Sequence, residues 1–275
     1  MSRSRHEAVV ASPRVRRISW ALLDGAREPF FSIVLSIVFP PFFVESIAAD
    51  PVTGTAQWGY ALAAAALSLV MLAPVAGVIA DTSRRRKSWI GGCLGLAAAA
   101  LVALWPVTAG TPSSFVVLGL CIVAYVAIEL TRVFTDSLIS DVAGPAEIGA
   151  LSGLGVGIGF AATLAYLGAI SWSSSALAQG LEPGVIERVA TAATGPWLML
   201  LALPFFAFFA APAASRASGR LDPAGSSLRK RIVAAIELLR QDRQLARFLL
   251  ARMAYWDGTM ALFAFLTILA STTLD

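Results

Sequence analysis

Eight ionisable side chains lie inside stretches that are otherwise apolar, and their spacing could support chemistry. Asp24, Arg27 and Glu28, the first triplet, follow the i, i+3, i+4 pattern that puts side chains on one face of a helix. A second triplet shares a face in the same way, and a later stretch adds one basic and one acidic residue. The second triplet is Glu129, Arg132 and Asp136, and the later pair is Arg252 and Asp257.

The composition indicates that membrane-spanning helices position these charged residues. Of the 275 residues, 57% are hydrophobic and 14% are charged, where an ordinary globular protein has about 25% charged residues. Four runs without Asp, Glu, Lys or Arg, residues 51–80, 88–128, 148–181 and 189–215, are each long enough for a helix that crosses a bilayer. The sequence therefore predicts an all-α polytopic membrane protein.

In a membrane, the eight charged residues need an explanation. A charge at the centre of a bilayer costs about 3 kcal/mol or more, so such residues face a cavity or each other. Three cations and five carboxylates give the group a net charge of −2, so at least one carboxylate can take up a proton. Two interpretations stay open for each triplet: it handles a solute or protons, or it forms static ion pairs.

Other kinds of chemistry find little support in the residues. The single histidine, His6, lies in the polar N-terminal tail, and Cys93 and Cys121 lie in apolar runs without the spacing of a metal site or disulfide. We therefore expect no metal, no cofactor and no enzymatic activity. An intramembrane aspartic protease stays open as an alternative because Asp24 and Asp257 lie in different spans, although the flanking residues do not resemble one.

We predict seven membrane spans in four regions. A cytoplasmic tail, residues 1–17, precedes a six-helix bundle, residues 18–213. A cytoplasmic linker, residues 214–247, contains an amphipathic helix, and the seventh span lies within 248–275. The predicted spans are residues 18–44, 58–80, 88–109, 114–139, 147–171, 195–213 and 248–271, and the apolar face of the linker helix is Ile232, Val233, Ile236, Leu239 and Leu245.

The basic residues alternate from one connection to the next. They gather in the N-terminal tail, in the turn at 84–87 and in the linker, whereas the connections after the first and third spans have none. By the positive-inside rule the N-terminus is cytoplasmic, in a bacterial inner membrane on our expectation. Both triplets then lie in the cytoplasmic half of the membrane, at similar depth.

The fifth span carries a stripe of glycines. Intervals of four residues between them give a smooth face for close helix contact or sliding. A dinucleotide-binding fingerprint at Gly157-x-Gly159-x-x-Ala162 is rejected, because no strand precedes it. The glycines assigned to packing are Gly149, Gly153, Gly155, Gly157 and Gly159.

The turn between the second and third spans contains Gly77, then Asp81, then a basic run. It resembles the cytoplasmic signature of the major facilitator superfamily, although Thr82 and Arg84 stand where a basic residue and a glycine are usual. The resemblance implies a conformational latch in which the aspartate accepts hydrogen bonds from arginine. The plain alternative is a basic turn that only fixes topology. The latch residues are Gly77, Asp81, Arg84, Arg85 and Arg86.

The first span contains Ser19-Trp20-Ala21-Leu22, Asp24 and Pro29-Phe30, with Phe39-Pro40-Pro41-Phe42-Phe43 at its far end. Together with Leu250-Ala251-Arg252-Met253, these residues resemble a narrower branch, the vacuole effluxer-like, autophagy-related amino-acid permeases. The resemblance covers nearly the whole chain. It implies a six-helix N-terminal half of a major facilitator fold plus one helix of a second half, and cavity-lining roles for both triplets and the seventh span.

The function expected from this resemblance is secondary active transport of a small solute by alternating access. Amino-acid export and proton coupling are the finer expectations. Residues 21–31 and 254–264 share four of eleven residues, which indicates two parallel repeats. The partners are the solute and the lipid bilayer, not nucleic acid, with the missing second half or a dimer partner completing the carrier. A truncated, non-transporting relic or a receptor is the alternative.

Overall fold

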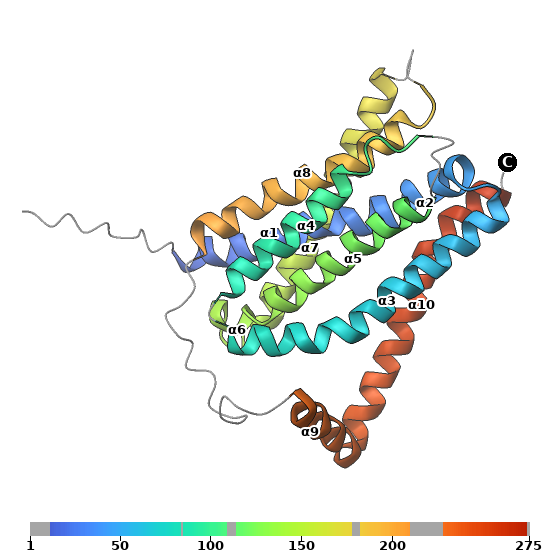
Figure 1. The fold of residues 1–275 in the computed structure, drawn as a ribbon. Helices are drawn as coiled ribbons and strands as arrows, with labels where there is room; N and C mark the ends of the chain where they lie inside the picture. Colours follow the sequence, from blue (N-terminus) through green and yellow to red (C-terminus); the bar gives the residue numbers. More distant parts are fainter. Residues whose placement is uncertain (1–11, 84, 109–113, 178–181, 210–227, 274–275) are drawn as a thin grey trace, which may run out of the picture.

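The computed structural model describes residues 12–83, 85–108, 114–177, 182–209 and 228–273. Within these residues the elements are helices, and the long ones run side by side as a bundle (Figure 1). Six of them are long and apolar enough to cross a membrane: Pro13–Ile47, Pro51–Ala80, Ser114–Asp136, Ile148–Ser175, Val185–Phe208 and Arg243–Ala270. The prediction of an all-α polytopic membrane protein is confirmed.

The helices follow the chain without strands between them in the described part. In order they are α1 (Pro13–Ser32), the π-helix η1 (Ile33–Ile37), α2 (Phe39–Phe42), the π-helix η2 (Phe43–Ile47), α3 (Pro51–Thr82), α4 (Arg86–Val102), α5 (Ser114–Asp136), α6 (Ile139–Val142), α7 (Ile148–Leu177), α8 (Val185–Phe208), α9 (Leu228–Gln241) and α10 (Arg243–Thr273).

The first span runs from α1 through η2, and its prolines shape it. Proline has no N–H, so Pro29 leaves the carbonyl of Gly25 without its helical donor. The indole of Trp197 on α8 donates to that carbonyl at 3.1 Å. The carbonyl of Ser36, which Pro40 and Pro41 leave free in the same way, accepts a hydrogen bond from the hydroxyl of Thr267 on α10. Both carbonyls that the prolines leave free therefore accept hydrogen bonds from other helices.

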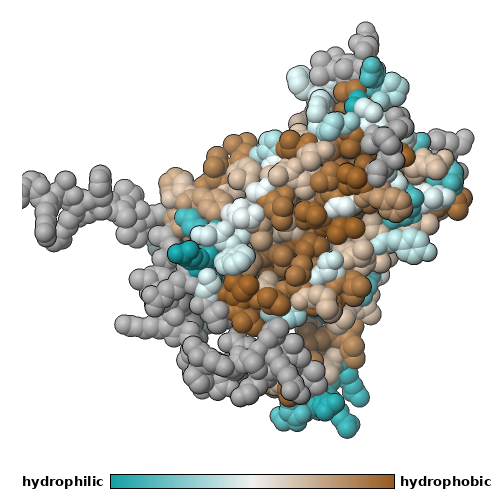
Figure 2. All heavy atoms as spheres, viewed as in Figure 1, coloured by the Kyte–Doolittle hydropathy of each residue, from teal (hydrophilic) through white to brown (hydrophobic). Residues whose placement is uncertain are grey.

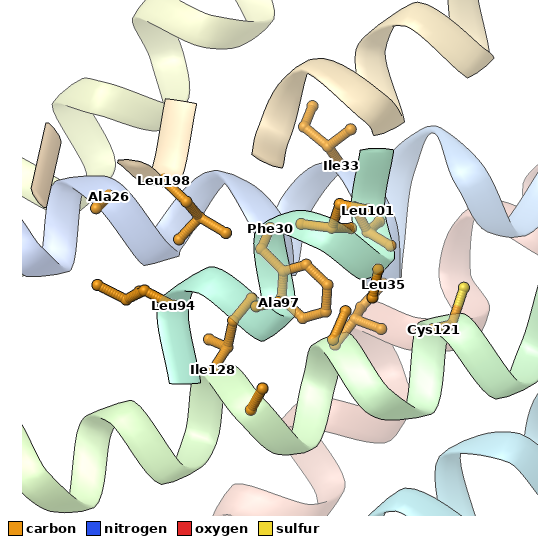
Figure 3. Close-up of a cluster of buried hydrophobic side chains, with 14 of the residues drawn as sticks. Ala26, Phe30, Ile33, Leu35, Leu94, Ala97, Leu101, Cys121, Ile128 and Leu198 are labelled. Atoms are coloured by element: carbon orange, nitrogen blue, oxygen red, sulfur yellow. The ribbon is translucent and has the colours of Figure 1, made fainter. Parts of the chain in front are cut away.

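The apolar core lies where four helices meet. α1 packs between α7 and α8, α5 packs between α3 and α4, and α4 packs against α8 and so joins the two groups of helices. Figure 3 shows the side chains at this junction, with Phe30 of α1 among Leu94 and Leu101 of α4, Ile128 of α5 and Leu198 of α8. Trp58 of α3 is also buried, against Phe39 and Phe43. The first span is therefore an internal helix of the bundle.

The predicted spans differ from the helices in their bounds, most of all the second, third and sixth. The third, predicted as 88–109, forms α4, which ends at Val102 after 17 residues. Residues before a proline avoid the helical region, and Pro106 follows a turn. The second and sixth begin earlier than predicted. Asp50 caps α3 by accepting from the N–H of Thr53 at 2.9 Å, and Gly184, at φ 80°, opens α8.

The ends of the helices gather at two opposite ends of the bundle. At one, the basic end, the start of α1 meets the α5–α7 connection through the ion pair of Arg17 with Glu147. At the other, Phe42 of α2 packs against Gly184 at the start of α8. Apolar side chains cover the middle of the face in Figure 2, with hydrophilic ones toward its ends. The helices therefore alternate in direction, as spans of a polytopic protein do.

The linker helix and the last span stand at the edge of this bundle. α9 falls within the linker, where an amphipathic helix was predicted. Val233 on it is exposed and Leu239 half-buried, whereas the side chains of Ile232 and Ile236 lie outside the described residues. α10 is exposed along most of its length, and Ile268 is buried near its end (Figure 1). The division into four regions stays a prediction.

Candidate functional site

The first triplet is built around a buried arginine on α1. Arg27 forms an ion pair with Asp24 one turn earlier, and the exposed fractions of the two side chains are 5% and 23%. Glu28, the next residue, is half-buried. The Nη1 atom of Arg27 is buried and has no hydrogen-bond partner in the structure. One arm of the guanidinium is thus occupied and the other is free to bind a second carboxylate.

The second triplet lies on α5, which meets this part of α1 through side-chain contacts. The indole of Trp20 donates to the carbonyl of Thr135 at 3.0 Å, and the rings of Phe31 and Tyr125 meet edge to face with centroids 6.3 Å apart. One contact lies near each end of the two triplets, so the triplets lie at a similar level along the bundle. Exposure increases along the second triplet, because Glu129 and Arg132 are half-buried and Asp136 is exposed.

The charges of the two triplets act on one another across the helices. Arg132 attracts the carboxylate of Glu28 on the opposite helix. Arg27 in turn attracts Glu129 and Asp136. The two cations and four carboxylates of the triplets give a net charge of −2. The fold therefore brings the six residues into one electrostatic cluster, which we call the charge cluster.

The last pair of predicted site residues lies on α10. Arg252 and Asp257 are both exposed, and the carboxylate of Asp257 is close enough to act on Tyr125. The contact that joins α10 to the charge cluster comes from Trp256, whose ring lies under the guanidinium of Arg132 at 5.9 Å. Sequence reasoning missed Trp256, because a tryptophan in an apolar span carries no signal of its partner.

The predicted glycine stripe of α7 divides into two groups. Gly155 and Gly159 are buried against α1, where a side chain would meet Asp24 and Glu28 respectively. On the other side of the contact, a side chain at Gly25 would meet Ile158. The remaining glycines assigned to packing face open space, and they are Gly149, Gly153 and Gly157.

The predicted latch is described only in part. Arg84 and the side chain of Asp81 lie outside the described residues, and Gly77 is half-buried with open space beside it. Arg85 is exposed, whereas Arg86 donates to the carbonyls of Ala80 and, at 3.3 Å, of Ser137.

Arg86 has an acidic partner that the sequence did not assign. Its Nη1 atom lies 3.5 Å from Oδ2 of Asp141, whose side chain is 7% exposed. The backbone carbonyl of Asp141 accepts from Arg16 at 2.9 Å. Lys87 caps the end of α8 by donating to the carbonyls of Phe206 and Phe209 at 2.6 and 2.9 Å. Basic side chains at the starts of α1 and α4 therefore bind the α5–α7 connection and the end of α8 at the basic end.

Comparison with known proteins gives one informative match. No family model matches the chain, and no solved structure matches it. The chain is 27% identical, over 249 residues, to YxiO, an uncharacterized MFS-type transporter of Bacillus subtilis (strain 168). It is similar to a transporter of the major facilitator type. The match covers 87% of this chain and 56% of YxiO, so the chain spans about half the length of this relative.

The part of the chain that the structure describes contains no candidate metal site. No group of three or more His, Cys, Asp or Glu side chains there is arranged to hold an ion. The charge cluster mixes carboxylates with guanidinium groups. Such a mixture can bind a solute that carries both charges, or exchange protons among its carboxylates.

Proposed function

We propose that this chain is part of a secondary active transporter of the major facilitator type, which moves a small solute across a membrane by alternating access. The similarity to YxiO and the six apolar helices support this proposal. The chain would supply the six-helix N-terminal half and the first helix of a second half. Its orientation, with the basic end in the cytoplasm of a bacterial cell, follows from the positive-inside rule.

The observation that carries the proposal is the charge cluster between α1 and α5. Arg27 is buried beside Asp24 within a span, and Arg132 acts on carboxylates of both helices. Buried charges are retained in membrane proteins mainly where a solute or ion passes. A purely static role would need every charge to be paired, whereas the cluster holds more carboxylates than cations.

The same cluster supports a finer proposal for the solute. An amino acid carries an ammonium group and a carboxylate, which the acidic and basic members of the cluster complement. The resemblance of the first span to amino-acid permeases of the vacuole effluxer-like branch points to the same class. An excess of carboxylates provides a place for a coupled proton.

At the basic end, we propose that Arg86 and Asp141 act with the described part of the latch. Arg86 joins the turn after α3 to the connection between α5 and α7, through Asp141 and Ser137. An ion pair between two connections favours one arrangement of the helices and must break when they move apart. The pair would therefore stabilise one of the two access states.

The test is transport by the complete carrier in liposomes. Counterflow of labelled amino acids is measured first, and uptake under an imposed proton gradient second, with protein-free liposomes as the control. We expect counterflow of at least one amino acid, and uptake that rises with the gradient. Counterflow of other solutes alone would overturn the substrate class. Solute binding without any counterflow would favour the receptor alternative and contradict transport.

A further inference from the structure

The contact between α1 and α7 matches carboxylates on one helix to glycines on the other. Asp24 and Glu28 are four residues apart on α1, and Gly155 and Gly159 are four residues apart on α7. Residues at this interval lie one turn apart on the same face. The two acidic residues of the first triplet therefore sit over the two buried glycines of α7, one pair for each turn.

The space at each glycine is taken up by the acidic residue opposite. A Cβ atom at position 155 would overlap the carboxylate of Asp24. A Cβ atom at position 159 would lie 3.3 Å from both Cβ and Cγ of Glu28, and 3.7 Å from the backbone oxygen of Asp24. The carboxylate tip of Asp24 meets α7 at one glycine, whereas the stem of Glu28 meets it at the other.

The carboxylate above Gly155 is the one that pairs with Arg27. Because Arg27 is almost fully buried, Asp24 must keep one position to stay in reach of it. A methyl group at position 155 would overlap Oδ2 of Asp24, whereas Oδ1 of the same carboxylate pairs with Arg27. The two oxygens belong to one planar group, so displacing Oδ2 from α7 also moves Oδ1. Removing the partner of a buried cation leaves its charge uncompensated, which is strongly unfavourable.

We propose that Gly155 is a positioning residue that holds Asp24 against Arg27, and that Gly159 seats Glu28 beside it. If the charge cluster serves transport, as proposed above, then α7 sets the positions of charged groups that transport uses. This consequence rests on the proposed function. The two glycines thus have a role beyond close helix packing. Gly153 and Gly157, which lie on the same helix but face open space, have no such role.

The test compares four variants of the full chain in lipid nanodiscs with the wild type. They are Gly155→Ala, Gly157→Ala, Asp24→Ala and the double variant Asp24→Ala/Gly155→Ala. The first readout is modification of Asp24 by a hydrophobic carbodiimide at one fixed pH, measured by mass spectrometry. In the wild type the ion pair with Arg27 holds the carboxyl group of Asp24 against α7, where only 23% of its side chain is exposed to the reagent. We expect about fivefold more modification in Gly155→Ala and wild-type modification in Gly157→Ala.

The second readout is thermal unfolding of the same variants. Gly155→Ala should lower the melting temperature in the wild-type background. In the Asp24→Ala background it should have no further effect, because the group that it displaces is gone. Were Gly155→Ala too unstable to purify, the double variant would be compared with Asp24→Ala, because both lack the partner of Arg27. Equal melting temperatures of these two variants would support the proposal, and a lower melting temperature of the double variant would overturn it.

Either of two results contradicts the proposal. One is wild-type carbodiimide modification of Asp24 in Gly155→Ala. The other is an equal loss of melting temperature with and without the Asp24 carboxylate, which would mark Gly155 as a packing residue only. Neither readout involves transport. A carrier that fails in liposomes while both readouts succeed would therefore overturn the proposed function and leave the positioning role intact.

Discussion

At the residue scale, side-chain donors replace helical hydrogen bonds that the prolines of the first span cannot make. Trp197 is the clearest case, because its indole N–H replaces the helical donor that Pro29 cannot supply to Gly25. The Trp197 ring also packs edge to face on Tyr166, with centroids 5.1 Å apart. The tryptophan therefore joins α8 both to α1 and to α7.

Trp197→Phe should lower the free energy of unfolding by about 1–3 kcal/mol, the usual effect of leaving a buried polar group without its partner. Phenylalanine keeps one aromatic ring but is smaller than the indole, so the loss combines the missing hydrogen bond to Gly25 with some lost packing. The measurement is unfolding of the detergent-solubilised chain, followed by circular dichroism. Trp172→Phe is the matched control, because Trp172 is exposed on α7. Equal stability of the two variants would show that the hydrogen bond contributes nothing.

At the element scale, α10 is held to the bundle at few points. Thr267 donates to the carbonyl of Ser36, and Phe265 contacts α3 beside Gly59, where a Cβ atom would lie 3.5 Å from its ring. Nearer its start, Trp256 meets Arg132. A helix with so few buried contacts separates more readily from its neighbours than an internal helix such as α1.

Thr267→Val should loosen α10, because valine keeps the shape of threonine and removes the hydroxyl donor. We expect amide hydrogen exchange in the second half of α10 to rise about fivefold, while exchange in α1 and α5 stays at the wild-type rate. Thr259→Val is the control, because the Thr259 hydroxyl donates to Tyr255 within α10 itself. A similar rise for both variants would mean that the contact with Ser36 does not anchor the helix.

Sequence patterns predicted the elements better than the contacts between them. Uncharged runs located the spans. The sixth was predicted to begin too late because Glu187 and Arg188 are charged, although both lie in the first turn of α8. Helical spacing placed each triplet on one face. The partners Trp256 and Asp141 could not be predicted, because the rotation of one helix against another depends on packing around the whole bundle.

At the scale of the whole molecule, the helix ends separate into a basic end and an opposite end. Arg16, Arg17, Arg86 and Lys87 all bind groups of neighbouring connections at the basic end. Basic residues stay on the cytoplasmic side during insertion. We therefore expect the basic end of the bundle to face the cytoplasm.

Cysteines placed at the two ends of α7 test this orientation. Ser140→Cys, in α6 at the basic end, should react with a membrane-impermeant maleimide only from the cytoplasmic side. Glu182→Cys, before α8, should react only from outside; both residues are exposed. The native Cys93 and Cys121 are replaced by alanine in this background. Reversed labelling would contradict the orientation and move the charge cluster to the outer half of the membrane.

The central claim is that the charge cluster handles solute or protons, and Asp24→Asn in the complete carrier tests it most directly. The measurement is a pH series of solute exchange and of proton-driven uptake in liposomes, with Asp50→Asn as the control because asparagine caps a helix as well as aspartate does. We predict that Asp24→Asn reaches the membrane but loses most proton-driven uptake, while Asp50→Asn keeps both activities. Wild-type rates of exchange and uptake for Asp24→Asn across the whole series would contradict the claim and make the Asp24–Arg27 pair a structural ion pair.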